Sequence, residues 1–348
     1  MRITHDYLYN KILDLIMKKL VNSPEDIVDE MLDGLVAERP ETLRRVKDSN
    51  VLVRQDAPVE GEVAVTSGGG SGHEPAFAGY IGDGFLHGAA SGEVFTSPTP
   101  DMFETLIRSV DAGEGVVVII NNYDGDIMNL DTAVELVEME SDINIETVVV
   151  DDDVAVEDSE YTTGRRGVAG ATFALKIASA KAAQGADLNT VAETTREAID
   201  CIGTMSMALT PCVTPEKGES TFTLGDNKME VGIGLHGEPG VERTSLAPAD
   251  EITDRLVDAV LEDVSPSGEI ATLVNGTGGT PLMELYVVNR RLTERIGDTG
   301  LDHWEAWVGE YMSSLDMCGC SVTVMDLKDE FKQLLSAPAD SPAMTIPE

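Results

Sequence analysis

Short apolar runs alternate with amphipathic segments in the first half of the chain. Residues 115–120 and 145–150 are apolar runs of the kind found in strands that are buried on both faces. Between them, residues 130–139 carry apolar side chains at helical spacing together with acidic ones, which predicts a helix. A short strand at residues 63–65 leads into a glycine-rich loop. Strand, helix and strand in this order predict βαβ units and a parallel sheet.

The same spacing predicts the remaining elements. In the first half, helices are expected at residues 1–16, 23–35 and 170–183. In the second half, helices are expected at residues 188–202, 250–261 and 282–291, and strands near 221–224, 229–233, 270–274 and 321–325. The fold class is therefore α/β with two α/β domains, the first with a largely parallel sheet flanked by helices and the second with a smaller mixed sheet. A boundary between residues 185 and 215 is expected.

Composition changes this picture mainly through charge. The 348 residues include 24 Lys and Arg against 63 Asp and Glu, a formal net charge of −39 at pH 7. Nucleic acid and anionic membranes are therefore not expected as partners, because both would repel the protein. Molar salt screens such self-repulsion, since the Debye length falls to about 3 Å, and we interpret the charge as that of a salt-accumulating halophile. An acidic mesophilic protein that uses its charge for solubility is the alternative.

Signals for secretion, membrane insertion and disulfide bonding are weak. Lys11 and Asp14 interrupt any signal-peptide core, and no apolar run approaches the roughly 18 residues of a membrane span. A cytoplasmic location is expected. The chain has only four cysteines, so a disulfide scaffold is not expected. Cys318 and Cys320 lack a second Cys or His pair at zinc spacing, and we interpret them as core residues or free thiols.

Two loops that follow predicted strands carry candidate chemistry. Residues 67–75 read Ser-Gly-Gly-Gly-Ser-Gly-His-Glu-Pro, and their glycines let backbone N–H groups approach an anion or a small polar ligand. No Gly-Lys-Ser/Thr follows, so this is not a P-loop, and a flexible turn is the alternative. Residues 121–126, Asn-Asn-Tyr-Asp-Gly-Asp, follow a buried strand, at the sheet edge where open α/β folds bind ligands. Plain turn chemistry is the alternative there.

Residues 232–237 match the pattern Gly-x-Gly-x-x-Gly, but we reject a dinucleotide site. Glu238, Pro239 and Gly240 follow at once, where a helix should begin, and no clear βαβ unit with a ribose-binding acid follows. What remains is His236 on a glycine-flanked loop. Such a loop could present the imidazole to a cleft without neighbouring bulk.

Two charged motifs leave alternatives open. Asp151, Asp152 and Asp153 follow a predicted strand and could bind a metal, but a solvated acidic tip is favoured in so acidic a chain. Arg165 and Arg166 stand out among few cations and could either meet an anionic partner or pair with local carboxylates. We assign no metal site.

Taken together, the motifs resemble the K subunits of dihydroxyacetone kinases. The resemblance covers residues 17–348 in order and rests on residues 67–75, 93–100, 122–126, 151–155, 161–169, 222–240, 273–286 and 314–317. K subunits typically start with Met-Lys-Lys-Leu, which stands here at residues 17–20, so residues 1–17 are expected to be an extension. The resemblance implies a first domain at residues 18–200, to which residues 322–348 are expected to return, and a second at residues 201–321.

The resemblance also implies roles for individual residues. In the family, the histidine that matches His236 forms a hemiaminal with the substrate carbonyl, as a neutral imidazole can. The residues that match His73 and Asp126 bind the substrate hydroxyls and perform acid–base chemistry, and one of them takes the proton of the attacking hydroxyl. The glycine-rich segment, here Gly70, Ser71 and Gly72, should line the same pocket.

One position departs from the family pattern, because Asn121 stands where many members have lysine. Asparagine offers a neutral donor to a substrate oxygen, whereas lysine offers a charged one. The departure puts in question the tightness of binding and the preferred short-chain ketose. Asn121 is nevertheless expected in the substrate site.

Partners are implied by the same resemblance. Phosphoryl transfer needs a nucleotide with Mg²⁺, which the family places on a separate L subunit or a C-terminal domain. This chain is therefore expected to bind dihydroxyacetone without a cofactor of its own, to form a homodimer, and to meet ATP or ADP and Mg²⁺ only on the L subunit. Two alternatives remain, namely a non-catalytic ketose sensor that regulates a partner and a kinase subunit for another short ketose or triose.

Overall fold

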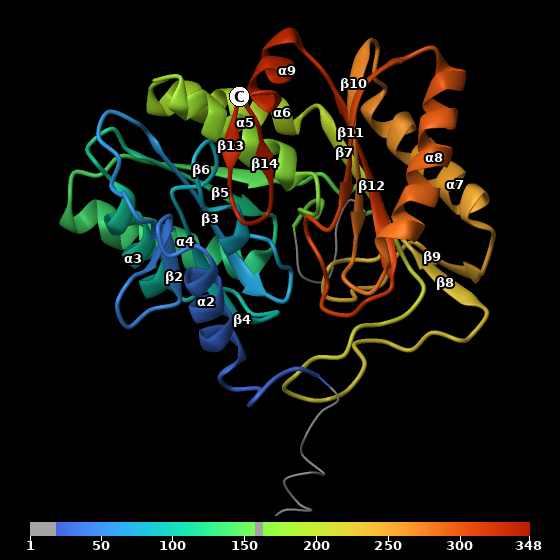
Figure 1. Cartoon of the computed structure of the whole chain (residues 1–348), viewed down its shortest axis with the longest axis horizontal. Helices are drawn as coiled ribbons and strands as arrows, with labels where there is room; N and C mark the ends of the chain where they lie inside the picture. The colour runs from blue at the N-terminus through green and yellow to red at the C-terminus, as the bar shows by residue number, and fades with distance from the viewer. Residues whose placement is uncertain (1–18, 157–162) are drawn as a thin grey trace, which may run out of the picture.

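Two six-stranded sheets organise the structure, a computed structural model that describes residues 19–156 and 163–348. Figure 1 shows the sheets in two halves of the molecule, each with its own helices. The predicted α/β class with two α/β domains is confirmed. The helix expected at residues 1–16 and the expected extension lie outside the described residues.

The first sheet is largely parallel, as predicted. Its order is β1-β2-β4-β3-β5-β6. Strands β3, β4, β5 and β6 are parallel to one another, whereas β2 pairs antiparallel with both β1 and β4. The strands are β1 (Leu43–Arg45), β2 (Val51–Arg54), β3 (Ala64–Ser71), β4 (Gly88–Val94), β5 (Val116–Asn121) and β6 (Ile145–Val150). In β5, successive side chains such as Val117 and Val118 enter opposite cores, which is why this strand is a continuous apolar run.

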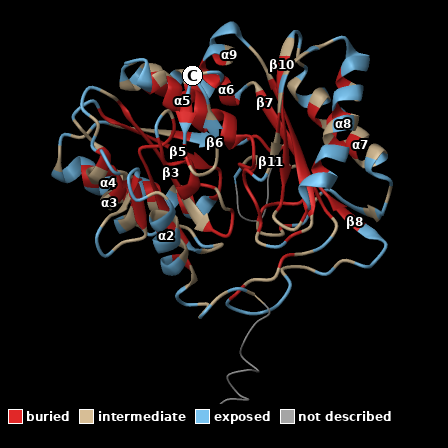
Figure 2. Ribbon diagram, in the orientation of Figure 1, coloured by how far each residue is buried: buried red, intermediate tan, exposed pale blue. Residues whose placement is uncertain are grey.

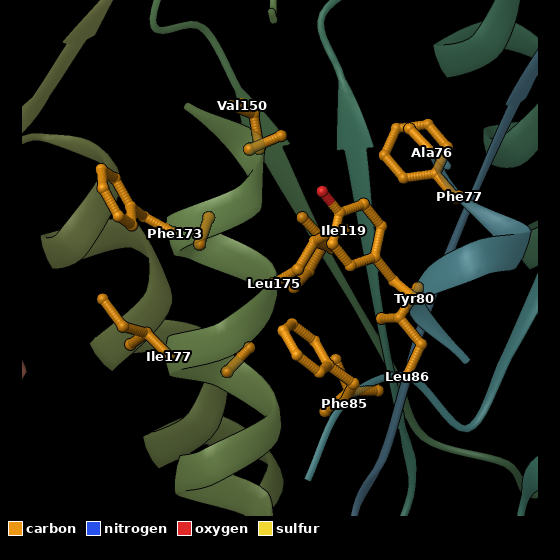
Figure 3. Close-up of a cluster of buried hydrophobic side chains, with 14 of the residues drawn as sticks. Ala76, Phe77, Tyr80, Phe85, Leu86, Ile119, Val150, Phe173, Leu175 and Ile177 are labelled. Carbon is orange, nitrogen blue, oxygen red and sulfur yellow. The ribbon is translucent and has the colours of Figure 1, made fainter. Parts of the chain in front are cut away.

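Helices cover both faces of this sheet. One face packs against α3 (Pro100–Val110) and α4 (Asp124–Glu140). The other face packs against α2 (Ile27–Glu38), α5 (Ala171–Ala183) and α6 (Leu188–Ile199). Figure 3 shows part of that second core, where Tyr80 of the short 3-10 helix at Ala78–Tyr80 and Phe85 lie against Leu175 of α5.

The second sheet is mixed, as predicted, but it is not smaller than the first. Its order is β11-β10-β12-β7-β8-β9, and among these pairs β10 and β11 are parallel while the others are antiparallel. The strands are β7 (Ile202–Ala208), β8 (Lys228–Val231), β9 (Glu242–Ser245), β10 (Glu269–Gly276), β11 (Asp302–Gly309) and β12 (Gly319–Asp326).

The prediction of a smaller second sheet was wrong because three of these strands have no recognisable strand pattern in the sequence. β9 and β11 are edge strands with few buried side chains, so neither shows an apolar run. β7 follows α6 closely, and the helix predicted to reach residue 202 in fact ends at Ile199. Residues 221–224, predicted as a strand, form none.

Helix α5 lies between the two sheets. On the outer side of the second sheet, α7 (Ala249–Val264) and α8 (Leu282–Thr299) form a separate core with β7, β10 and β12. The inner side joins the core of the first half, where Phe173 of α5 packs against Trp307 of β11 with ring centroids 4.9 Å apart. Covered on both sides, α5 is buried along almost its whole length (Figure 2).

The C-terminal segment packs against the first half. After β12, α9 (Asp329–Leu335) lies on α5, and the hairpin β13 (Ala339–Asp340) and β14 (Thr345–Ile346) follows, with Asp340 bridging to Asp83. The domain limits at residues 200 and 321 stay a prediction, and the pairing of β12 associates residues 322–326 with the second sheet. Within the described part of the chain, no helix combines the length and apolar character needed to cross a bilayer.

Candidate active site

A cavity of about 450 Å³ opens between the two halves of the molecule. The first half contributes residues at the carboxyl ends of β3, β4 and β5, including Gly70, Tyr123 and Asp126, and the second half contributes His236 and Glu238. A small inner pocket shares Gly70, Tyr123, Asp126 and His236 with this cavity and adds His73 and Asn121. The carboxyl edge of the first sheet therefore carries the site, as expected for an open α/β sheet.

The glycine-rich segment contributes unequally to this cavity. A Cβ at Gly70 would lie 2.7 Å from the backbone nitrogen of Thr96, so only glycine lets β3 lie this close to the loop after β4. Ser71 and Gly72 do not line either cavity. The Ser71 hydroxyl donates to the Gly92 carbonyl at 2.7 Å, and the Gly72 N–H donates to the carboxylate of Glu74 at 3.0 Å.

Two histidines from different halves meet at the cavity wall. Their Nε2 atoms, of His73 and His236, are 3.1 Å apart. His73 is buried and stacks on Phe95, with ring centroids 5.0 Å apart, whereas the His236 side chain remains 27% exposed. The rings of Tyr123 and His236 also meet at an interplanar angle of 85°, with centroids 4.9 Å apart. Sequence reasoning singled out both histidines, and the structure brings them together.

Hydrogen-bond partners assign the protons of this pair. The Nδ1–H of His73 donates to the Ser313 carbonyl at 2.9 Å, because a carbonyl can only accept. The Nδ1–H of His236 donates to the Glu238 carboxylate at 2.8 Å. The contact between the two Nε2 atoms then needs one further proton. Burial, followed by the neighbouring His236, lowers the pKa of His73 to about 3, so the His73 ring itself is neutral.

Asp126, in the first turn of α4, is the third predicted catalytic residue and lines the same cavity. It is only 8% exposed, and its Oδ1 has no hydrogen-bond partner among the described residues. Burial raises the pKa of its carboxyl to about 6, against the opposing effects of a hydrogen bond with Ser97 and of His236. A carboxylate with this pKa can accept a proton near neutral pH.

Asn121 ends β5 and lines the inner pocket, and its place in the substrate site stays a prediction. Its Nδ2 donates to the Gly167 carbonyl at 3.2 Å, while its Oδ1 is buried without a partner in the described part of the chain. The Tyr123 hydroxyl is likewise buried without a described partner. The pocket thus presents unpaired polar atoms, which a polyhydroxylated ligand can satisfy.

The acidic tip predicted at residues 151–153 is wrong for two of its three members. Asp152 and Asp153 are almost fully buried. Asp152 accepts backbone N–H groups of Val168 and Gly170, both at 2.7 Å, and Asp153 pairs with the buried Arg166 at 2.6 Å. The side chains are buried because each carboxylate has its own donors. Over the described residues, no three His, Cys, Asp or Glu side chains gather as a metal site would require.

The remaining motifs have local roles. Arg165 pairs with Asp263 at 2.6 Å, and Arg166 with Asp153, so both arginines take the predicted alternative of nearby carboxylates. Cys320 is buried in the core and Cys318 is half-buried, and both are free thiols, as predicted.

Sequence reasoning missed Tyr123, Phe95 and Glu238 as members of the site. Tyr123 stands inside the predicted loop 121–126, and Phe95 inside the motif 93–100, so position in the chain was an available signal. Glu238 stands two residues after His236, but a carboxylate at that spacing has no distinguishing pattern in so acidic a chain.

Comparisons with known proteins extend over most of the chain. The model of the Dak1 domain family matches residues 33–343. The chain is 43% identical to the dihydroxyacetone-binding subunit DhaK of PTS-dependent dihydroxyacetone kinase 1 from Listeria innocua, over 93% of this chain and 99% of that protein. It is 44% identical to the corresponding subunit of the PEP-dependent dihydroxyacetone kinase from Escherichia coli, over 94% of this chain and 99% of that protein.

Two solved structures have the same fold. The dihydroxyacetone kinase of C. freundii superposes with a TM-score of 0.88 at 29% identity, and the match covers 96% of this chain but 61% of that longer one. The dihydroxyacetone kinase operon co-activator DhaQ superposes with a TM-score of 0.86 at 31% identity, over 92% of this chain and 98% of the co-activator. The chain belongs to the Dak1 domain family, together with the DhaK subunits of dihydroxyacetone kinases.

Proposed function

We propose that this chain is the dihydroxyacetone-binding subunit of a dihydroxyacetone kinase. The observation that carries the proposal is the position of His236, whose imidazole lines a cavity of about 450 Å³ next to His73 and Asp126. The family resemblance supports the substrate, and the names of the relatives point to the same ketone. The reaction is the transfer of a phosphoryl group to a hydroxyl of the ketone, giving dihydroxyacetone phosphate.

The ketone is held as a hemiaminal on His236 Nε2. Addition requires that the proton between the rings first leave this nitrogen, and His73 Nε2, 3.1 Å away, accepts it. The Nε2 lone pair then forms a bond to the carbonyl carbon, the C=O π bond breaks, and the oxygen takes the proton from His73. A His73 whose pKa lies near 3 is a strong acid toward this developing alkoxide.

Asp126 is the general base for phosphoryl transfer. His73 Nδ1 is bound to Ser313 and its Nε2 to His236. Asp126, whose Oδ1 has no partner among the described residues, is therefore the better placed of the two to accept the proton of the attacking hydroxyl. Its pKa of about 6 leaves it largely ionised at neutral pH, which a base requires. We expect Asp126→Asn to retain ketone binding and to lose turnover.

The nucleotide and Mg²⁺ act on a partner L subunit. The family resemblance supports this division, and the solved C. freundii kinase, which has been crystallised with AMP-PNP and Mg²⁺, is a longer chain of which this one covers 61%. The phosphoryl donor is either ATP or a phosphotransferase relay that recharges ADP on the L subunit.

Carbon NMR with dihydroxyacetone labelled at its carbonyl carbon tests the covalent step. We expect a tetrahedral signal of protein-bound substrate with the wild type and none with His236→Ala. His303→Ala is the matched control, since His303 lies on β11 and bonds to Thr272 rather than to the cavity. A bound signal that survives in His236→Ala would contradict the hemiaminal on this residue.

A non-catalytic ketose sensor is a second candidate, and the 31% identity with the co-activator DhaQ favours it. A sensor and a kinase subunit would bind the ketone alike but would differ in turnover. Adding an L subunit and a phosphoryl donor separates them, because only a kinase subunit supports formation of dihydroxyacetone phosphate. Asn121 in place of lysine favours a further variant of the kinase, with another short ketose such as erythrulose as substrate, and competition between the two ketones measures that preference.

We also propose that the protein works as a homodimer in the salt-rich cytoplasm of a halophile. The net charge of −39 supports concentrated salt as its solvent. The family resemblance supports the dimer, as do apolar side chains that α8 leaves exposed, among them Met283 at 75% and Tyr286 at 55%. Light scattering in molar salt tests the dimer, and a monomer at micromolar concentration would contradict it.

A further inference from the structure

Glu238 holds His236 through two hydrogen bonds. Its Oε2 accepts the backbone N–H of His236 at 2.8 Å, and its Oε1 accepts the Nδ1–H of the same residue at 2.8 Å. Glu238 is itself only 5% exposed, so water can solvate its carboxylate very little. These two hydrogen bonds determine which ring nitrogen of His236 carries a proton and which one faces the cavity.

The guanidinium group of Arg166 lies buried near the Glu238 carboxylate. Arg166 is fully buried, donates from Nε to Asp153 at 2.7 Å, and donates from Nη2 to the Gly232 carbonyl at 2.7 Å. Its Nη1 has no hydrogen-bond partner among the described residues. A Cβ built on Gly234 would lie 2.7 Å from this Nη1 and 2.2 Å from Glu238 Oε2, so both groups point into the space that the glycine leaves free.

We propose that Glu238 is the positioning residue of His236, which keeps its Nδ1 protonated and balances the positive charge of the substrate adduct, and that the buried Arg166 beside it keeps Glu238 ionised. This inference rests on the proposed hemiaminal and deepens it. Arg166 belongs to the first half and the loop of His236 to the second, so the pair also joins the two halves at the site.

The charge balance of the covalent step explains why a carboxylate is needed beside His236. A ring that bonds to carbon through Nε2 while it keeps Nδ1–H carries a full positive charge. Both Nδ1–H groups donate elsewhere, so the contact between the two Nε2 atoms needs one further proton, and the free pair of rings already holds the proton that the step uses. On addition this proton ends on the substrate oxygen, so the imidazolium, the Glu238 carboxylate and the neutral His73 are the same before and after. Ketone binding should therefore neither take up nor release a proton.

The other groups that face His236 are accounted for. His73 and Tyr123 are neutral, since burial lowers the pKa of the first to about 3 and raises the pKa of the second well above its usual range. Asp126 has a pKa of about 6 and is ionised at pH 8. Burial alone would raise the pKa of Glu238, but its hydrogen bond with His236 and the nearby positive charges hold it at about 2. At pH 8 none of these groups is close to its titration midpoint.

Calorimetric titration of the whole protein with dihydroxyacetone at pH 8, in buffers of different ionisation enthalpy, tests the charge balance. For the wild type, the apparent binding enthalpy should not depend on the buffer. In Glu238→Gln the positive charge of the adduct loses its anion, so the adduct is less stable. We expect a Kd raised about 10- to 100-fold, the range for loss of a charged hydrogen-bond partner. A wild-type enthalpy that depends on the buffer, or a Glu238→Gln Kd within twofold of wild type, would overturn the proposal.

Glu230→Gln is the matched control. Glu230 is also a 5% exposed carboxylate of the second half, but it pairs with Arg243 and the Gly240 N–H and not with His236. It should leave both the Kd and the buffer independence unchanged. For Arg166, the double variant with Asp153→Asn and Arg166→Gln removes both buried charges, and we expect a Kd raised at least about 10-fold with thermal unfolding still cooperative. Carbon NMR separates the two proposals, because a wild type without a tetrahedral signal refutes the hemiaminal itself.

Discussion

Replacement of Asp126 by asparagine should stabilise the free protein at alkaline pH and abolish its turnover. The carboxyl of Asp126 has a pKa of about 6 in the folded state because burial disfavours its charged form, against a usual value of 3.8. The shift is about two pH units, and each unit is worth about 1.4 kcal/mol. Ionisation of Asp126 at pH 8 therefore costs the folded state up to about 3 kcal/mol. The neutral amide of asparagine avoids this cost.

The pH dependence follows from the sign of this shift. Since the folded pKa is raised, the associated stability is fully present below pH 3.8 and is lost as the pH rises through about 6. The position of Asp126 in the first turn of α4 offsets part of the cost, because a helix N-terminus favours negative charge. We expect Asp126→Asn to raise the free energy of unfolding by about 1–3 kcal/mol at pH 8, and to bring no gain near pH 4.

Urea denaturation at constant molar salt, at several pH values between 4 and 8, measures this difference. Asp131→Asn is the control, because Asp131 lies exposed on the same helix and should change the unfolding free energy by less than about 0.5 kcal/mol at any pH. The reasoning would be refuted if the unfolding free energies of wild type and Asp126→Asn differed by the same amount at every pH, or if the variant were less stable than the wild type at pH 8. The same variant, supplied with L subunit and a phosphoryl donor, should form no dihydroxyacetone phosphate.

Two further substitutions test other parts of the site. Arg166→Met leaves Asp153 buried without its cation and should cost about 3–5 kcal/mol in urea denaturation, most of which Asp153→Asn in the same chain should restore; an unaffected single variant would contradict the ion pair. Tyr123→Phe removes a buried hydroxyl that lacks a described partner, so the unfolding free energy should not fall by more than about 0.5 kcal/mol, while the KM for the ketone should rise if this hydroxyl donates to substrate. An unchanged KM would exclude Tyr123 from substrate binding.

The parts of the fold that the sequence predicts well are those in which one segment determines its own burial. β5 is apolar at every position but its last, so its place in the middle of a sheet follows from composition alone. β4 (Gly88–Val94) is rich in glycine, alanine and serine, and becomes a strand only because β2 and β3 lie on either side of it. Such pairing depends on residues distant in the chain, which local patterns do not reveal.

The site shows the same division. His73, Asp126 and His236 could be singled out because each stands in a distinctive loop, and the resemblance supplied their roles. Nothing in the sequence indicated the burial of Asp153, since it depends on Arg166, which is brought to it by the fold. The role of the Ser313 carbonyl in orienting His73 was equally hidden, because a backbone oxygen has no signature in the sequence.

The bond between His73 and His236 joins segments 163 residues apart in the chain, one from each half of the molecule. A rotation of one half by a few degrees would separate these nitrogens while every strand stayed paired. The contact between the two histidines is therefore a property of the junction and is more fragile than either sheet. In a chain with a net charge of −39, self-repulsion is strongest at low salt, so lowering the salt concentration should disturb this junction before either sheet unfolds.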